Sequence, residues 1–402
     1  MDAQRYAIKG QVLAAEDTRL QEALAAIHDT PERPRCLCIP GGVEMYVARH
    51  RQFVVKRMPG TGCLHHPTCS SYEPEGSLSG LGELLGEAVL EPAPGHIELR
   101  VDFPWSRMTG RAVPRGELEL PAEVTRPRQH MSLRAVTHFL FERAGFNRWA
   151  PAMEGRRNQA VLRKYLLEAA GEIVVKRVPL AERLYVPEQF HEGAKLEAAR
   201  RRREKLSLLW GRDGDNPLAL LIGEYKTCEP TSYGHRLWVR HMPDAPLLMA
   251  SKTWERMQRV FAPILEARDA DTCSPCRILL SALIRARREH TYEIDSASLM
   301  LASEQWIPVD GVHELPLLQA LVVQQRRFVK PLRYDARSAS HFPNVLLLDA
   351  GPVPVPLHVL SAFVDPKERA IKEKVIAASV PPGWVWRPDE SMPAFPSLAP
   401  AR

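Results

Sequence analysis

Four of the seven cysteines in this 402-residue chain lie in one short stretch, from Cys36 to Cys69. Two runs inside it, Val43–Ala48 and Gln52–Arg57, have the length and the β-branched content of hairpin strands. Zinc ribbons place two ligand pairs at opposite ends of a hairpin, and the folding of the hairpin brings the pairs together. The sequence therefore predicts a zinc-ribbon-like module, stapled by a metal, near the N-terminus.

Spacing decides which side chains of this stretch are candidate ligands. Zinc takes four nitrogen or sulfur ligands in a tetrahedron, usually as two close pairs on tight turns. The favoured ligands are Cys36, Cys38, His66 and Cys69, and the alternatives in the same loop are Cys63 and His65. A closed set of four leaves no position for water, so the zinc would be structural rather than catalytic. Unliganded thiols in an intracellular protein are the alternative explanation of the cluster.

The start of the chain and its hydropathy predict a location. No basic segment followed by an apolar core opens the sequence, and no apolar run approaches the roughly 18 residues of a membrane span. An odd number of cysteines without a secretory signal is typical of thiols and metal ligands rather than disulfides. We therefore expect a cytoplasmic protein without membrane contact.

The net charge of +6 is distributed unevenly along the chain. Residues 126–210 contain eighteen Lys and Arg against nine Asp and Glu, a balance of +9, so the remainder carries −3. Clustered basic side chains are typical of proteins that bind nucleic acid, because they release counterions from the phosphate backbone. DNA is therefore the predicted partner, and a solvated helix face is the alternative explanation.

Within this basic segment, residues 131–210 have the element order of a winged helix. Ser132 can cap a first helix, a second helix is predicted over 156–170, and the runs 172–178 and 182–186 are predicted to form a hairpin. In a winged helix, one helix enters the major groove and the hairpin contacts phosphates. A purely structural helix pair with a hairpin would give the same pattern. The candidate nucleic-acid-binding residues are Arg156, Arg157, Arg163, Lys164, Lys176, Arg177, Arg200, Arg201, Arg202 and Arg203.

The last four of these arginines belong to a charged helix predicted over residues 190–210. Glu197 precedes Arg201 by four residues, which is the stabilising orientation for a helical ion pair. A helix that pairs with itself in solvent is therefore the alternative to direct nucleic-acid contact.

The second half of the chain predicts an α/β domain. Its first strand, over residues 218–222, ends in Glu224 and Lys226, and residues 236–240 are its predicted hairpin partner. A Glu-x-Lys at the end of a strand is used by metal-dependent nucleases, with the carboxylate on the metal and the lysine near the attacking water. This short motif makes Glu224, Lys226 and Asp349 alternative catalytic residues of a protein otherwise predicted to be non-enzymatic.

Two further segments follow this strand pair. Residues 254–267 are predicted to form an amphipathic helix. Cys273 and Cys276 stand at the start of the next predicted helix, and we interpret them as buried thiols flanking a turn.

The last part of the chain has a distinctive element order. A helix after His313 is followed by strands over 343–349 and 355–360, a helix over 366–377 and a short strand over 384–386. This order resembles the core of the restriction-endonuclease-like superfamily, whose motif is Pro-Asp on one strand and Asp/Glu-x-Lys on the next.

The residues at these motif positions depart from that pattern. Asn344 stands where the aspartate would be, and His358 and Leu360 stand where the acid and the lysine would be. Asp349 and Glu314 are the remaining nearby carboxylates. Because two-metal phosphodiester cleavage needs several converging carboxylates, the resemblance implies a nuclease-like core without activity.

Motifs along nearly the whole chain resemble an uncharacterised bacterial family, domain-of-unknown-function family 1173. The N-terminal cysteine pattern carries much of this resemblance. The other motifs are Arg57-Met-Pro-Gly-Thr-Gly62, Met131-Ser-Leu-Arg134, Gly145-Phe-Asn-Arg-Trp149, Leu180 to Glu188, Gly223-Glu-Tyr-Lys226, Trp306-Ile-Pro308 and Lys330-Pro-Leu-Arg-Tyr334. The resemblance implies carriage on plasmids and integrating conjugative elements, but it implies no reaction.

These observations predict an α+β multidomain protein. Its expected parts are a helix and zinc-ribbon-like module (1–75), a Pro/Gly-rich β connector with strands near 96–103 and 117–120 (76–130), a basic winged-helix-like domain (131–210), an α/β domain with a nuclease-like core from about 310 (215–388), and a disordered tail (389–402). The favoured function is a non-enzymatic, zinc-containing, nucleic-acid-associated protein of a mobile element. A metal-dependent nuclease and a protein-interaction scaffold are the alternatives.

Overall fold

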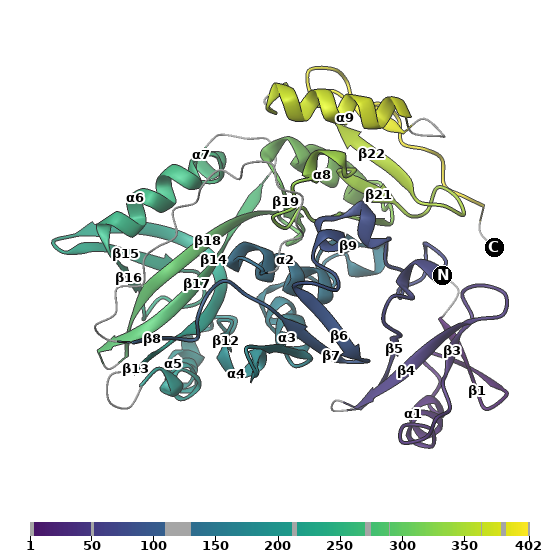
Figure 1. Ribbon diagram of the computed structural model, residues 1–402, viewed down its shortest axis with the longest axis horizontal. Coiled ribbons are helices and arrows are strands. Elements are labelled where there is room, and N and C mark those ends of the chain that lie inside the picture. Colours follow the sequence, from purple (N-terminus) through teal and green to yellow (C-terminus); the bar gives the residue numbers. More distant parts are fainter. Residues whose placement is uncertain are drawn as a thin grey trace.

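The computed structural model describes residues 4–49, 52–108, 130–210, 215–269, 275–288, 290–362, 364–378 and 383–400. It is a mixed α/β structure built from several sheets (Figure 1). The predicted strand over 117–120 and the predicted thiol at Cys273 lie outside the described residues.

The N-terminal module is a five-stranded sheet of order β2-β1-β3-β4-β5 with one short helix. Its elements are β1 (Arg5–Ile8), β2 (Gln11–Ala14), α1 (Leu20–Ala25), β3 (Arg35–Cys36), β4 (Val43–Arg49) and β5 (Phe53–Arg57). The β4–β5 pair confirms the hairpin that the β-branched runs predict. Buried side chains from α1 and β1 to β4, including Cys36 and Met45, form a small core of its own.

A second sheet joins segments far apart in the sequence, in the order β11-β10-β7-β6. Its strands are β6 (Val89–Ala93), β7 (His96–Leu99), β10 (Ile173–Val175) and β11 (Val178–Pro179), and β10 runs parallel to β7. Along the chain, the helices α2 (Leu133–Arg143) and α3 (Gln159–Ala170) lie between β7 and β10. The short helix α4 (Leu180–Arg183) follows β11. Ser132 caps α2 as expected, because its Oγ accepts a hydrogen bond from the Ala135 N–H at 3.2 Å.

The hairpin predicted between 172–178 and 182–186 is wrong. Lys176 and Arg177 both have positive φ, 50° and 64°, and this turn closes a shorter hairpin between β10 and β11. The second predicted strand is β12 (Leu184–Tyr185), which pairs in parallel with β14 (Ala219–Thr231) of another sheet. Burial of Leu184 and Tyr185 against that sheet outweighs local pairing, so the winged-helix interpretation loses its predicted wing.

The centre of the molecule is a small closed β-barrel. Its strands are β14 (Ala219–Thr231), β15 (Gly234–Val239), β16 (Leu247–Met249), β17 (Cys276–Arg288) and β18 (Thr291–Ser303). The ring runs β14-β15-β16-β18-β17 and returns to β14, which pairs with β17 over residues 219–224 and with β15 over 225–231. All neighbours are antiparallel except β16 and β18, which are parallel. The predicted strand at 218–222 and its hairpin partner are confirmed.

Two hydrophobic cores meet at the barrel wall. Leu237, Val239 and Leu280 belong to the core that also contains Met257 of α6, whereas the alternating Leu220 and Leu279 pack with the buried face of α2. The helices between β16 and β17 are α6 (Ser251–Val260) and α7 (Ala262–Asp269), so the single helix predicted over 254–267 is divided in two. Cys276 begins β17 rather than a helix. The charged helix is α5 (Lys195–Lys205), shorter than predicted.

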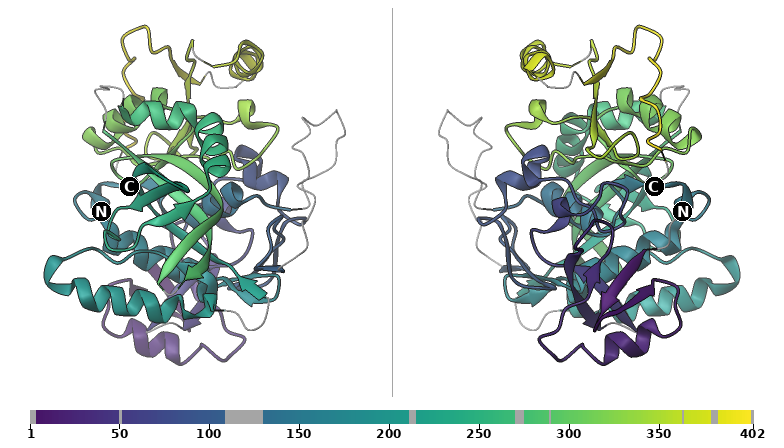
Figure 2. Two further views of the ribbon diagram at one scale, coloured as in Figure 1. Left: turned by 90° about the vertical axis from the view of Figure 1, so that its left-hand side faces the viewer. Right: turned by 90° about the vertical axis from the view of Figure 1, so that its right-hand side faces the viewer.

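The last sheet has the order β23-β22-β21-β20-β9. Its elements are β9 (Arg148–Trp149), β20 (Phe328–Val329), β21 (Val345–Leu347), β22 (Val355–Val359) and β23 (Trp384–Trp386), with α8 (Leu315–Val323) before β20 and α9 (Pro366–Ala378) between β22 and β23. Apart from the short β20, which is not predicted, this confirms the predicted helix-strand-strand-helix-strand order. Figure 2 shows α1 and α9 at opposite ends of the molecule. Three minor strands complete the fold: β8 (Ser106–Met108) pairs with β13 (Asp215–Pro217), and β19 (Pro308–Val309) pairs with β18.

The segment 389–400, predicted to be disordered, lies against the last sheet. The centroids of the Trp384 and Phe395 rings lie 5.3 Å apart, and Trp384 Nε1 donates to the Ala394 carbonyl. The Ala399 N–H donates to the Asp349 carbonyl at 2.8 Å. The prediction of disorder followed from proline content, and it missed the few apolar side chains that dock this segment.

Candidate metal centre

Two turns of the N-terminal module bring one histidine and three cysteines together. Cys36 ends β3, and Cys38 follows in the turn that leads through Gly41 and Gly42, both at positive φ, into β4. His65 follows a single turn of 3₁₀ helix (Gly62–Leu64), and Cys69 lies in the next turn of the chain. The β4–β5 hairpin separates the two halves and folds them onto each other, as the sequence predicts.

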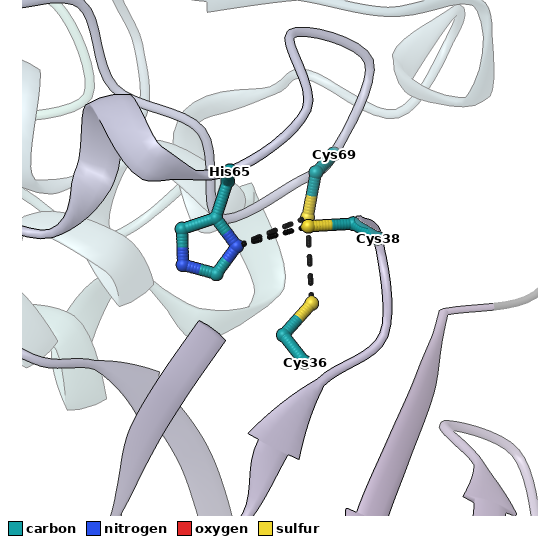
Figure 3. A group of neighbouring side chains, drawn as sticks. All are labelled: Cys36, Cys38, His65 and Cys69. Carbon is teal, nitrogen blue, oxygen red and sulfur yellow. Dashed lines mark hydrogen bonds between the residues drawn. The ribbon is translucent and has the colours of Figure 1, made fainter. Parts of the chain in front are cut away.

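The distances within this group fit a tetrahedral metal. All four ligand atoms lie within 4.8 Å of one another (Figure 3). A zinc–sulfur bond of about 2.3 Å implies sulfur atoms roughly 3.8 Å apart in a tetrahedron, and sulfur and nitrogen atoms roughly 3.6 Å apart. The Sγ atoms of Cys36 and Cys69 are 3.7 Å apart, and His65 Nδ1 lies 3.3 Å from Cys38 Sγ and 3.7 Å from Cys69 Sγ. The group could therefore hold a metal ion.

The structure corrects the predicted ligand set at one position. His65, given as an alternative, occupies the fourth corner, while His66 is turned away and its Nδ1 lies 2.8 Å from Thr68 Oγ1. Cys63, the other alternative, is exposed and lies outside the group. The spacing of two residues favoured His66, but consecutive side chains in this turn point in different directions, and only one of them faces the thiols.

Burial and hydrogen bonds shift the protonation of two of the thiols in opposite directions. Cys36 is completely buried, and Gln4 Nε2 lies 3.6 Å from its Sγ. The Ser71 N–H donates to Cys69 Sγ at 3.4 Å. Hydrogen bonding with Cys38, and then with Cys69, lowers the pKa of the Cys36 thiol. Hydrogen bonding with Cys36, and then with Cys38, raises the pKa of the Cys69 thiol. Since thiolates are the form that binds metal, the arrangement favours a metal-binding thiolate at Cys36.

Arg148, from outside the N-terminal module, holds the loop that carries Cys69. Arg148 of β9 donates to the backbone carbonyls of Ser70 and Tyr72, both at 2.7 Å. Tyr72 packs with Val329, Leu346 and Leu348 of the last sheet in a small cluster. The loop that carries Cys69 is thus also the contact between the N-terminal module and the last sheet. Arg148 lies in the family motif Gly145–Trp149, and that is the sequence signal that could have identified it; Gln4 has none.

Many of the ten predicted nucleic-acid-binding residues have internal partners. Arg157 donates to the carbonyls of Gly145, Phe146, Arg148 and Gln305. Arg202 is buried and paired with Asp244. The remaining contacts are Arg163 with Val186 and Glu188, Arg201 with Glu188 and Glu197, Arg200 with Glu197, Lys164 with Glu168, Lys176 with the Phe103 carbonyl, and Arg203 with the Ala199 carbonyl. Arg156 and Arg177 are exposed. The local pairing considered as the alternative for α5 is thus present, and it extends to α3.

The alternative catalytic residues do not converge. Glu224 is buried and paired with Arg277 at 3.0 Å and with Arg240 at 3.3 Å. Asp349 is buried and paired with Arg326 at 2.9 Å. Lys226 is exposed. Within the part of the chain that the structure describes, neither carboxylate belongs to a group able to hold a metal ion, and the Cys/His group is the one found there.

The positions that resemble nuclease motifs form a buried polar network instead. Asn344 Nδ2 donates to Glu314 Oε1 at 2.5 Å, and Lys372 of α9 donates to Asn344 Oδ1. Glu314 also pairs with the buried Lys330 at 3.3 Å. His358 is 2% exposed, and burial lowers its pKa to about 4. The polar groups of this network hydrogen-bond largely to one another, and the Glu314 carboxylate is neutralised by Lys330.

By fold and site, the molecule is a mixed α/β protein of several sheets with an N-terminal Cys₃His group that could hold a metal ion. The chain belongs to the family described as Protein of unknown function (DUF1173), whose model matches residues 6–389. No curated protein and no solved structure matches the chain. Of the helices in the described segments, none has the length and apolarity needed to cross a membrane.

Proposed function

We propose that this is a non-enzymatic, nucleic-acid-associated protein whose Cys₃His group binds a structural zinc ion. The choice of zinc rests on the donor set, because three thiolates and one imidazole in a tetrahedron suit Zn²⁺ among the common biological divalent cations. Four protein ligands leave no open position for a substrate or an activated water. The metal would therefore stabilise the N-terminal module and its contact with the last sheet.

The single observation that carries the nucleic-acid part is the topology of the barrel. Five strands close in the order first-second-third-fifth-fourth, the third and fifth strands are parallel, and α6 and α7 lie between the third and fourth. This is the Greek-key arrangement of the OB fold, which commonly presents oligonucleotide-binding surfaces on its second and third strands. The inference from fold to ligand is an analogy, and the net charge of +6 agrees with it. Carriage of the family on mobile elements would supply a context for such a protein.

The ion pairs support the absence of catalysis. Glu224 and Asp349 are each neutralised by arginine, so neither is available to a catalytic cation. A protein-interaction scaffold is the second candidate, and the internal pairing of the basic residues on α3 and α5 favours it.

Two measurements on the full-length chain test the proposal. Metal analysis of protein purified without an affinity metal should give one zinc ion per chain, absent from the Cys36→Ser, Cys69→Ser double variant. Gel-shift assays with short oligonucleotides should show binding that weakens with salt, and no cleavage on addition of Mg²⁺ or Mn²⁺. Absence of zinc from the wild type would refute the structural metal. Absence of binding to any nucleic acid at low salt would refute the nucleic-acid part and favour the scaffold.

A further inference from the structure

The β14–β15 hairpin projects from the barrel (Figure 1). An aromatic side chain at its tip is exposed. Ser232 and Tyr233 form the two-residue turn between the paired Thr231 and Gly234, and the Tyr233 side chain is 93% exposed. Gly234 has φ of 143°, and a Cβ atom there would lie 2.4 Å from the Met249 carbonyl oxygen. Only glycine fits this close approach of β15 to β16, so the backbone under Tyr233 is fixed by packing.

The register of β15 places a cation next to this tip on the outer face of the barrel. Leu237 and Val239 are buried in the barrel core, so Arg236 and Trp238 lie on the opposite face. Arg236 is exposed and Trp238 is half-buried. On β16, the half-buried Leu248 stands directly across from Arg236. Tyr233, Arg236 and Trp238 therefore follow one another as a ribbon from the tip along β15, with Leu248 beside Arg236 on β16.

The charged residues described around this ribbon leave the Arg236 side chain available to a ligand. Two acids of β18, the strand beyond β16, are used internally, since Glu293 pairs with Arg285 at 3.0 Å and Asp295 pairs with Arg107 at 2.9 Å. Arg236 has no ion pair in the described part of the chain, although Glu229 stands opposite it on β14. Arg287 and Arg288 at the end of β17 likewise have none among the described residues.

We propose that this ribbon, formed by the outer face of β15 and the tip of the β14–β15 hairpin, binds single-stranded nucleic acid. Tyr233 would stack on a base, and Arg236 would contact the phosphate backbone. A duplex hides its base faces, whereas a single strand offers them to an exposed aromatic ring, and such stacking tolerates any base. The ribbon is on the strands that bind oligonucleotides in OB folds. This inference rests on the proposed function and names the ligand class and the site.

Fluorescence anisotropy with a labelled oligothymidine and with a duplex of equal length tests the site on the full chain. We expect tighter binding of the single strand. Tyr233→Ala should weaken that binding about tenfold without changing its salt dependence, because stacking releases no counterions. Arg236→Ala should weaken it and also reduce the slope of log K against log salt by about 0.7, the value for one phosphate contact on a single strand. Glu229→Gln should strengthen binding, because it removes a carboxylate beside the phosphate path.

Two matched variants distinguish this site from other surfaces. Tyr165→Ala removes a partly exposed tyrosine from α3, and Arg156→Ala removes an exposed arginine of the basic segment; both should leave binding unchanged. Because Tyr233 and Arg236 are exposed, their variants should keep the wild-type melting temperature. If nucleic acid binds but only Arg156→Ala weakens it, or the duplex binds as tightly, the hairpin site is wrong while the proposed function stands. If no oligonucleotide binds, both the hairpin site and the proposed nucleic-acid function are wrong.

Discussion

The Sγ atom of Cys38 lies 3.3 Å from Nδ1 of His65, while the neighbouring His66 is hydrogen-bonded to the Thr68 hydroxyl. The two adjacent histidines therefore provide a matched pair. We expect His65→Ala to lose bound metal or weaken its binding by at least about tenfold, because a tetrahedral site with three protein ligands admits water. His66→Ala should keep one metal ion per chain. Metal analysis after dialysis against a chelator measures both, and loss of metal from His66→Ala alone would restore the ligand set favoured by spacing.

Arg156 and Arg157 are also adjacent and differ in their surroundings. Arg157 donates to several backbone carbonyls and lies over the Phe146 ring at 5.0 Å, whereas Arg156 is exposed. Arg157→Ala should lower the free energy of unfolding by about 3 kcal/mol, because it leaves partly buried carbonyls without donors. Arg156→Ala should change it by less than about 0.5 kcal/mol. Denaturant titrations compare the two, and equal effects would contradict the structural role given to Arg157.

Asp349 accepts hydrogen bonds from Arg326 and from the Arg327 N–H, and both side chains of the Asp349–Arg326 pair are buried. We expect Asp349→Ala to destabilise the protein by about 3 to 5 kcal/mol, because it leaves a buried guanidinium without a partner. The double variant Asp349→Leu, Arg326→Met should recover most of this loss, since it removes both charges. A double variant no more stable than the single one would show that Asp349 acts elsewhere.

Lys372 is 6% exposed and donates to an amide oxygen rather than to a carboxylate. Burial lowers its pKa from 10.5 to about 8, so between these values the unfolded chain binds more protons than the folded one. The contribution of Lys372 to stability therefore rises as pH increases from about 8 to 10.5. Lys372→Met should remove this rise and stabilise the protein at pH 7 by up to about 3 kcal/mol.

The exposed Lys374 on the same helix is the control for this prediction. Lys374→Met should change the stability by less than about 0.5 kcal/mol, because the Lys374 side chain is exposed. Thermal unfolding followed from pH 7 to pH 10.5 measures all three proteins. A wild-type profile that is flat over this range, or one unchanged by Lys372→Met, would show that the buried amine titrates normally.

Local patterns predicted many elements of this fold correctly. The runs around Val47 and Val55 form the β4–β5 hairpin, Ser132 caps α2, and the order from α8 to β23 follows the apolar periodicity. These features depend on propensity, capping and side-chain alternation, which act between residues close in the sequence. The pairing of β12 with β14, and of β10 with β7, could not be read in this way. Their partners lie elsewhere in the chain, and burial rather than local propensity selects them.

The same division applies to the sites. Composition and spacing alone indicated that a group able to hold a metal ion lies between Cys36 and Cys69, because soft ligands on two turns joined by a hairpin are typical of metal sites. The tertiary structure decided that His65 rather than His66 faces the thiols, because the orientation of a side chain depends on the turn that carries it. It also decided that Arg157 and Arg202 have internal partners, while Arg236 is exposed and has no ion pair among the described residues, since a sequence counts charges but only folding brings each charge to its partner.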